Sequence, residues 1–149
     1  MKTILYIVCM KVSFDFDDCL DDLQVQMYCR ELKERGIDVW ICTARTPSVL
    51  NGEPIGDSIN YGWNTDVFRM CAELDIPEDH VIMTDCGMKS DHLRGKGFIW
   101  HLDDMKPNII DVTKNSDCIG VLYQPWKPDE WKNKCELLLN QNKDESTIL

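Results

Sequence analysis

The sequence predicts a single α/β domain in three layers, doubly wound around a mainly parallel sheet. Short apolar segments alternate with helical segments along the chain, an order typical of βαβ units with right-handed crossovers. The 149 residues suffice for one hydrophobic core and hardly for two. A composition of 44% hydrophobic and 28% charged residues is that of an ordinary globular domain.

The first βαβ unit is predicted near the amino terminus. Residues 10–16 favour a strand, because β-branched and aromatic residues occur there without Gly or Pro. Residues 20–35 carry apolar side chains at helical spacing, and Gly36 stands where the residue after a helix is often glycine. Residues 37–42 form a second apolar strand. Because the connections are short, we expect the two strands to be parallel.

The remaining chain continues the alternation. Residues 46–63 contain three glycines and two prolines without periodicity, which indicates a functional loop rather than a plain connector. Residues 140–149 are polar, so we expect one domain over residues 1–139 and a disordered tail after it. The further elements that we expect are a helix over 64–74, a strand over 81–84, a short helix over 91–94, a strand over 98–102, a short helix over 107–112, a strand over 118–123 and a helix over 128–139.

Charge and cysteine content restrict the partners and the compartment. The formal net charge of -10 opposes unspecific attraction to nucleic acid or to an anionic membrane. Eight cysteines without a C-x-x-C pair indicate buried thiols in a reducing compartment. Residues 1–9 are too short and too weakly patterned for a signal peptide, so we expect a cytoplasmic protein. They either extend the first strand or precede a true start at Met10.

Five aspartates lie at the end of the first predicted strand and just after it. Asp15 and Asp17 point to one side if the extended geometry persists, because side chains alternate along a strand. Two carboxylates at one site repel each other unless a cation is bound or one of them is protonated. Binding of Mg²⁺, which prefers oxygen ligands, is the simplest way to offset this repulsion. The alternative is an acidic, solvated loop that only caps the next helix.

Polar residues also follow other predicted strands. Thr43 ends the second strand, Lys89 stands before a short helix, and Asp103 and Asp104 end the strand over 98–102. The carboxyl ends of parallel strands meet at one edge of the sheet, where ligands bind. Carboxylates there can hold Mg²⁺, while a lysine and a hydroxyl bind phosphate oxygens. One aspartate is then free to attack phosphorus while another transfers a proton.

These segments resemble the motifs of the haloacid dehalogenase-like (HAD) superfamily of phosphotransferases. Its first motif, an apolar strand followed by D-x-D, is similar to residues 15–20 (DFDDCL). By this resemblance, Asp15 is the nucleophile and a metal ligand. Asp17 is then the acid/base, and its backbone carbonyl also binds the metal. Cys19 is a mild departure, at a position that shapes the turn.

The second and third motifs are similar to two further segments. An apolar strand ending in Thr or Ser matches residues 39–43, which implies that Thr43 binds phosphate and makes Arg45 a candidate for substrate contact. The third motif is a lysine at the start of a helix. Lys89 matches it best, and Lys96, between two glycines, is the alternative.

The fourth motif, an apolar strand ending in an acidic pair, is similar to residues 98–104. The resemblance implies that Asp104 is a metal ligand and that Asp103 supports it. It covers about residues 10–125 and implies a Rossmann-like HAD core. The expected activity is Mg²⁺-dependent hydrolysis of a phosphomonoester through an aspartyl phosphate. A degenerate member that binds phosphate or a protein partner without turnover is the alternative from another class.

The expected substrate follows from the missing cap domain. Only one helix fits between the first two strands, and only the loop 46–63 and one helix follow the second. Such capless HAD members often act on large or exposed phosphates. Tyr61 and Trp63 either stack on a base or anchor the loop. The net charge favours a nucleotide or another small phosphorylated metabolite over the alternative, a polynucleotide 3′ end.

Three other aromatic residues are candidates for a role in the site or in packing. His101 is a candidate for contact with the substrate or with the aspartate pair, because it lies in the strand that ends at Asp103. Trp126 and Trp131, near the last helix, are predicted to be packing residues rather than a binding platform.

Overall fold

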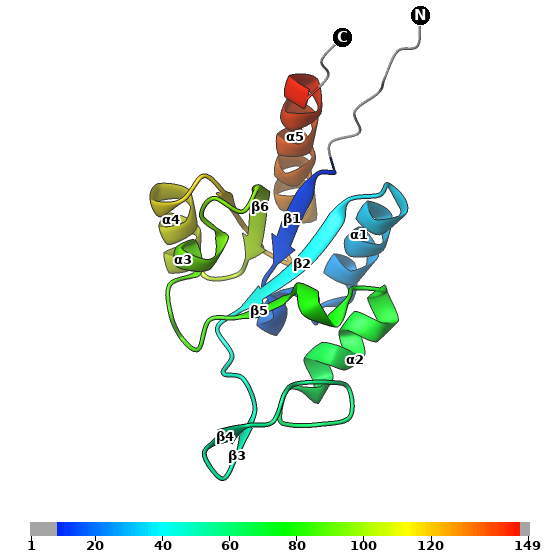
Figure 1. The fold of residues 1–149 in the computed structure, drawn as a ribbon. Coiled ribbons are helices and arrows are strands. Elements are labelled where there is room, and N and C mark those ends of the chain that lie inside the picture. The colour runs from blue at the N-terminus through cyan, green and yellow to red at the C-terminus, as the bar shows by residue number, and fades with distance from the viewer. Residues whose placement is uncertain (1–8, 147–149) are drawn as a thin grey trace, which may run out of the picture.

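A five-stranded parallel sheet forms the centre of the molecule (Figure 1). The structure is a computed structural model and describes residues 9–146. The strand order β5-β2-β1-β6-β7 reverses direction beside β1, and all neighbours pair in parallel. The α/β class and the parallel sheet are therefore confirmed. The strands are β1 (Lys11–Phe14), β2 (Asp38–Thr43), β5 (Val81–Met83), β6 (Phe98–Asp103) and β7 (Ile119–Leu122).

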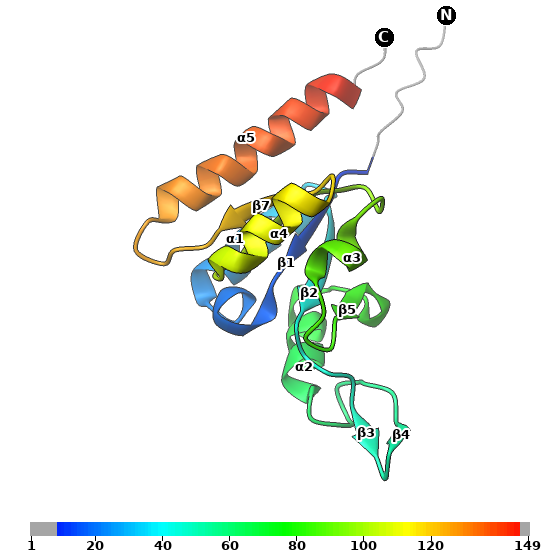
Figure 2. The same cartoon turned by 90° about the vertical axis from the view of Figure 1, so that its left-hand side faces the viewer.

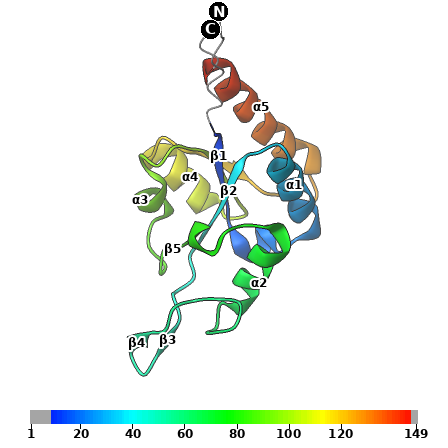
Figure 3. The same ribbon diagram turned by 45° about the vertical axis from the view of Figure 1, so that its right-hand side comes forward.

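Helices cover both faces of this sheet, which gives three layers (Figures 1 and 2). On one face lie α1, α2 and α5, and on the other lie α3 and α4 (Figure 3). This division follows from right-handed crossovers, because the chain crosses to the other side of β1 between β5 and β6. The helices are α1 (Leu23–Glu34), α2 (Thr65–Leu74), α3 (Lys89–Leu93), α4 (Lys106–Asn115) and α5 (Pro128–Ser146).

An aromatic cluster fills the larger core between the sheet and helices α1 and α5. The Trp100 ring of β6 lies 5.3 Å from Phe14 and 6.2 Å from Tyr28, measured between ring centroids. Tyr28 in turn lies 5.6 Å from Trp131 of α5. Such rings bury large areas and favour offset or edge contacts. The cluster therefore fixes both helices against the strands that carry the aspartates.

Besides small shifts of element ends, three features differ from the sequence expectation. β1 ends at Phe14 rather than at residue 16, because an irregular helical turn (Phe16–Leu20) interrupts the extended chain before α1. The loop 46–63 contains a small hairpin of β3 (Val49–Leu50) and β4 (Glu53–Pro54). Helix α5 continues past Leu139 to Ser146, where we expected a disordered tail. No Gly or Pro follows Leu139 in that segment to end the helix.

Most of the cysteines are buried, and so is one of the two tryptophans that were expected to pack. Every cysteine is free; Cys9 and Cys86 are exposed and the other six are buried. Trp131 is buried, as a packing residue is, but the interpretation of Trp126 as packing is wrong, because it is 72% exposed. Within residues 9–146, no helix has the length and apolarity that crossing a membrane requires. The predictions for residues 1–8 lie outside the described residues.

Candidate functional site

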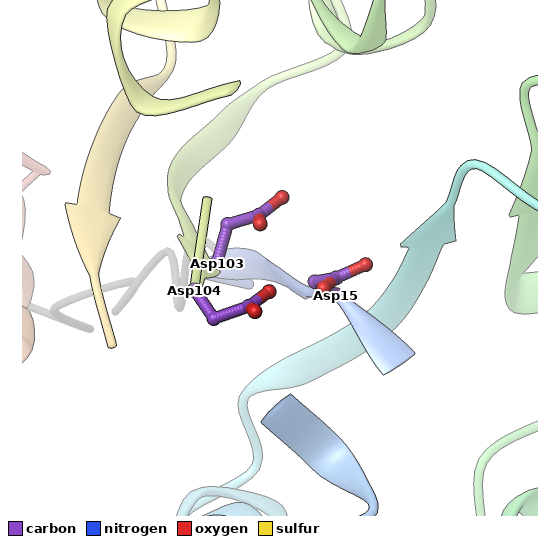
Figure 4. Close-up of side chains that lie close together, drawn as sticks. All are labelled: Asp15, Asp103 and Asp104. Atoms are coloured by element: carbon purple, nitrogen blue, oxygen red, sulfur yellow. The ribbon is translucent and has the colours of Figure 1, made fainter. Parts of the chain in front are cut away.

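The two central strands of the sheet deliver three carboxylates to one place. Asp15 follows β1, and its backbone N–H donates to the Leu102 carbonyl of β6 at 2.8 Å. Asp103 ends β6, and Asp104 follows it. Carboxylate oxygens of Asp15, Asp103 and Asp104 lie within 4.8 Å of one another and point toward a shared space (Figure 4). Three of the four aspartates predicted for this site therefore lie together at the carboxyl ends of parallel strands, and Asp17 does not join them.

A buried lysine joins two of these carboxylates. Lys89 is the first residue of α3 and is only 2% exposed. Its Nζ donates to Asp15 Oδ1 at 2.8 Å and to Asp103 Oδ2 at 2.6 Å. Lys96 is exposed, and its backbone carbonyl accepts from Lys11. The lysine of the cluster is therefore Lys89 and not the alternative, Lys96.

A layer of polar side chains behind the cluster orients Asp103. His101 Nε2 lies 2.8 Å from Asp103 Oδ2, and His101 Nδ1 lies 2.9 Å from Ser13 Oγ. With Nε2–H donating to the carboxylate, Nδ1 accepts from the serine hydroxyl. The Asn108 amide also donates to Asp103 Oδ2, at 3.1 Å, and the Met105 N–H donates to Oδ1 at 3.0 Å. The candidate contact of His101 with the aspartate pair is thus present.

Sequence reasoning missed Ser13 and Asn108. Ser13 stands two residues before Asp15, as His101 stands two residues before Asp103. Residues two apart in a strand point to the same face of the sheet. This alternation was the available signal for Ser13 and His101. Asn108, in the first turn of α4, had no comparable signal.

Burial and charge set the protonation of the cluster. Burial, reinforced by the charge of Asp103, raises the pKa of Asp15 to about 8, although Lys89 acts in the opposite direction. Burial also acts to raise the pKa of Asp103, but hydrogen bonds from His101 and the charge of Lys89 outweigh it and hold that pKa well below its usual range. Lys89 thus pairs with two of the three carboxyl groups, and the raised pKa of Asp15 favours its protonated form at neutral pH. A cation is the chemical complement of this arrangement.

The donor set fits a hard divalent cation. Asp15, Asp103 and Asp104 offer only oxygen ligands, and their spacing allows one ion to touch all three. Burial also raises the pKa of Asp104, so this carboxylate too gains from a positive neighbour. The carboxylates of Asp15, Asp103 and Asp104 could therefore hold a metal ion together.

Asp17 lies outside the three-carboxylate cluster. Its side chain is half exposed and forms an ion pair with Arg45, with Nη2 2.7 Å from Asp17 Oδ1. Strand pairing stops at Phe14, and the irregular turn Phe16–Leu20 begins between Asp15 and Asp17. Because the extended chain does not persist through Asp17, the alternation that predicted one shared side for Asp15 and Asp17 does not apply.

The two other predicted substrate contacts lie at the same end of β2. Thr43 is buried as the last residue of β2, and its Oγ1 accepts from the Arg45 backbone N–H at 3.3 Å. The Arg45 guanidinium binds Asp66 as well as Asp17. Asp66 was not singled out from the sequence, where an acidic residue in the first turn of a helix is an ordinary stabilising feature.

Comparisons with known proteins add no relative to this description. No family model, no curated protein and no solved structure matches the chain. The fold and the site together define an α/β protein with a parallel sheet and a buried acidic cluster able to hold a metal ion. What such a cluster does is inferred from its own geometry.

Proposed function

We propose that this protein is a Mg²⁺-dependent phosphomonoester hydrolase that works through an aspartyl phosphate on Asp15. The observation that carries the proposal is the buried Lys89, which bridges Asp15 and Asp103 beside Asp104 at the carboxyl ends of the central strands. If the cluster were only structural, Lys89 with Asp15 and Asp103 would be sufficient. Asp104 adds a third carboxylate, whose pKa is raised by burial. Mg²⁺, when bound, supplies positive charge that offsets the phosphate oxygens. Asp15, Asp103, Asp104 and the Asp17 carbonyl would hold it.

Each protein group has a defined step in this reaction. An Asp15 oxygen forms a bond to phosphorus while the bond from phosphorus to the leaving oxygen breaks. Asp17 donates a proton to that leaving oxygen. Asp17 then takes a proton from water, the water oxygen bonds to phosphorus, and the bond from Asp15 to phosphorus breaks. Inorganic phosphate leaves, and both aspartates return to their starting forms.

Lys89 and Thr43 orient the reactants in this proposal. The hydrogen bond from Lys89 fixes one Asp15 oxygen at 2.8 Å and leaves the other oxygen available for attack. Thr43, at the adjoining strand end, supplies a hydroxyl for the phosphate. Positioned donors are effective because phosphoryl transfer spreads charge over several oxygens.

The proposed substrate is a nucleotide or another small phosphorylated metabolite. The loop 46–63 carries exposed Tyr61 and Trp63 side chains, which offer aromatic surface for a base. No large insertion covers the strand ends within the described residues. The net charge of -10 weighs against a long polynucleotide, so the 3′-end phosphatase remains the second choice within enzymes.

The test is phosphate release from a panel of nucleotides, sugar phosphates and 3′-phosphorylated oligonucleotides with Mg²⁺. We expect Asp15→Asn to abolish turnover and Asp21→Asn, an exposed aspartate of the same acidic stretch, to retain it. EDTA should stop the reaction and Mg²⁺ should restore it. Metal-independent turnover, or an active Asp15→Asn protein, contradicts the mechanism. Equal partner binding by parent and variant without any turnover favours the non-catalytic module.

A further inference from the structure

Arg45 binds two carboxylates through the two adjacent edges of its guanidinium, which share Nη2. On one edge, Nε and Nη2 donate to Asp17 at 3.0 and 2.7 Å. On the other edge, Nη1 and Nη2 donate to Asp66 at 2.6 and 2.8 Å. The guanidinium carbon also lies 5.0 Å from the ring centroid of Phe16. Both edges that can grip an oxyanion with two parallel hydrogen bonds are therefore occupied.

This geometry changes the expected role of Arg45. A substrate phosphate would have to displace Asp17 or Asp66 to gain a bidentate contact with Arg45. Each of those pairs has two short, charge-assisted hydrogen bonds, which are the strong kind. Arg45 in this structure is thus a group that holds carboxylates rather than an open phosphate clamp.

The anchor of this arrangement is helix α2. Asp66 lies in its first turn, and its Oδ1 also accepts from the Val67 backbone N–H at 3.0 Å. Val67 is buried in the core, which fixes the start of the helix. Asp17, in contrast, lies on an irregular turn and has a half-exposed side chain. Arg45 therefore holds the Asp17 carboxylate in a fixed position relative to α2, although the backbone around Asp17 is irregular.

We propose that Arg45, anchored by Asp66, is a tether that keeps the Asp17 carboxylate out of the metal site. The inference rests on the proposed function, in which Asp15, Asp103 and Asp104 hold Mg²⁺ and Asp17 transfers protons. A free carboxylate two residues from a metal ligand is readily drawn in as a further ligand, because hard cations favour anionic oxygens. An aspartate bound to the ion is drawn away from the leaving oxygen, with which Asp17 exchanges a proton in the proposed reaction. Arg45 and Asp66 are thus positioning residues.

The test compares Mn²⁺ binding, followed by electron paramagnetic resonance, in the parent and in Arg45→Lys. Lysine cannot hold two carboxylates through paired, parallel hydrogen bonds as the guanidinium does. It keeps the positive charge, so the variant and the parent have the same net charge. We expect Arg45→Lys to bind Mn²⁺ about tenfold more tightly, through an added carboxylate ligand, and to lose kcat with little change in KM. Arg94→Lys, at an exposed ion pair with Asp91, is the control and should bind as the parent does.

The Asp17→Asn background identifies the source of any gain. If Asp17 is the added ligand, Arg45→Lys has no effect on Mn²⁺ affinity once Asp17 is asparagine. An unchanged affinity in Arg45→Lys, or the same gain with asparagine at position 17, overturns the tether. If the parent hydrolyses phosphomonoesters with Mg²⁺ but the variants give either of these two results, only the tether fails. If the parent binds no Mn²⁺ at all, the proposed function fails together with it.

Discussion

Lys89 is the residue on which the charge balance of the site depends. It is almost completely buried, and it is the cation that Asp15 and Asp103 share. Burial acts to lower its pKa, but the two carboxylates outweigh that effect and raise it, so the ammonium form is retained. A buried charge that loses its partner is costly.

Lys89→Met is expected to destabilise the metal-free protein by about 3 kcal/mol, because it removes the buried cation that pairs with the Asp103 carboxylate and donates a hydrogen bond to Asp15. The measurement is urea-induced unfolding in EDTA. Mg²⁺ should restore part of the loss by replacing the missing charge, but not the activity. Lys132→Met, which removes an exposed partner of Glu31, should change stability by less than about 1 kcal/mol. Equal stability of Lys89→Met and parent in EDTA would show that Lys89 is not the counter-ion.

The raised pKa of Asp15 predicts a pH dependence of stability without metal. The folded state holds the Asp15 proton up to about pH 8, whereas the unfolded chain releases it near its ordinary value of 3.8. The stability that this proton contributes is therefore present at low pH and is lost as the pH rises through about 8. Between about pH 7 and about pH 9 the parent should lose about 1 kcal/mol of unfolding free energy in EDTA.

Asp15→Asn is the control for this pH effect, because asparagine does not titrate. Its unfolding free energy should fall less than that of the parent over the same interval. Mg²⁺ should remove the difference, since a bound cation stabilises the ionised carboxylate. Parallel pH profiles of the two proteins in EDTA would mean that Asp15 is already ionised at neutral pH.

At the scale of elements, a buried polar cluster fastens the two ends of the loop 46–63. The Asn64 amide donates to the Thr46 carbonyl at 3.0 Å and to Asp57 Oδ1 at 3.0 Å. Ser48, fully buried, donates to Asp57 and accepts from the Trp63 backbone N–H. The loop is therefore closed at its base next to α2, the helix that carries Asp66.

Two glycines of this loop provide a matched prediction. Gly62 has φ +80°, and a Cβ there would collide with the Ser48 side chain, whereas Gly56 has φ +67° and open space around it. Gly56→Ala should cost about 1 kcal/mol from backbone strain alone. Gly62→Ala should cost a further amount of about 1–3 kcal/mol for the collision. Thermal unfolding and the rate of proteolysis within 46–63 are the measurements, and equal effects of the two variants would contradict a tightly closed base.

At the scale of the whole molecule, the net charge of -10 acts on every anionic substrate. Repulsion slows the approach of a small phosphomonoester, and salt screens that repulsion. We expect kcat/KM for a small substrate to rise modestly with ionic strength at constant Mg²⁺. A polynucleotide phosphatase with many backbone contacts should show a steep fall instead. A steep fall of kcat/KM with ionic strength for oligonucleotide substrates would favour the polynucleotide 3′-end phosphatase over the small-substrate hydrolase.

Much of the architecture could be predicted, because it follows from local patterns. Each strand of the parallel sheet was expected from a short apolar run, and Lys89 was expected at the start of a helix. The end of α5 was predicted wrongly, because a polar sequence without Gly or Pro does not show whether a helix continues. The turn after Asp15 was also missed, since strand alternation gives no sign of where pairing with a neighbour stops.

The sequence by itself determined which chemical groups stand at the ends of the strands, because apolar periodicity and the residues that interrupt it are local properties. It therefore determined Asp15, Thr43, Asp103 and Asp104 as neighbours at one edge of a parallel sheet. Only the tertiary structure decided how the charges are paired. Lys89 joins Asp15 to Asp103, while Arg45 joins Asp17 to Asp66. These pairings depend on distances across crossovers and on burial, which no spacing along the chain records.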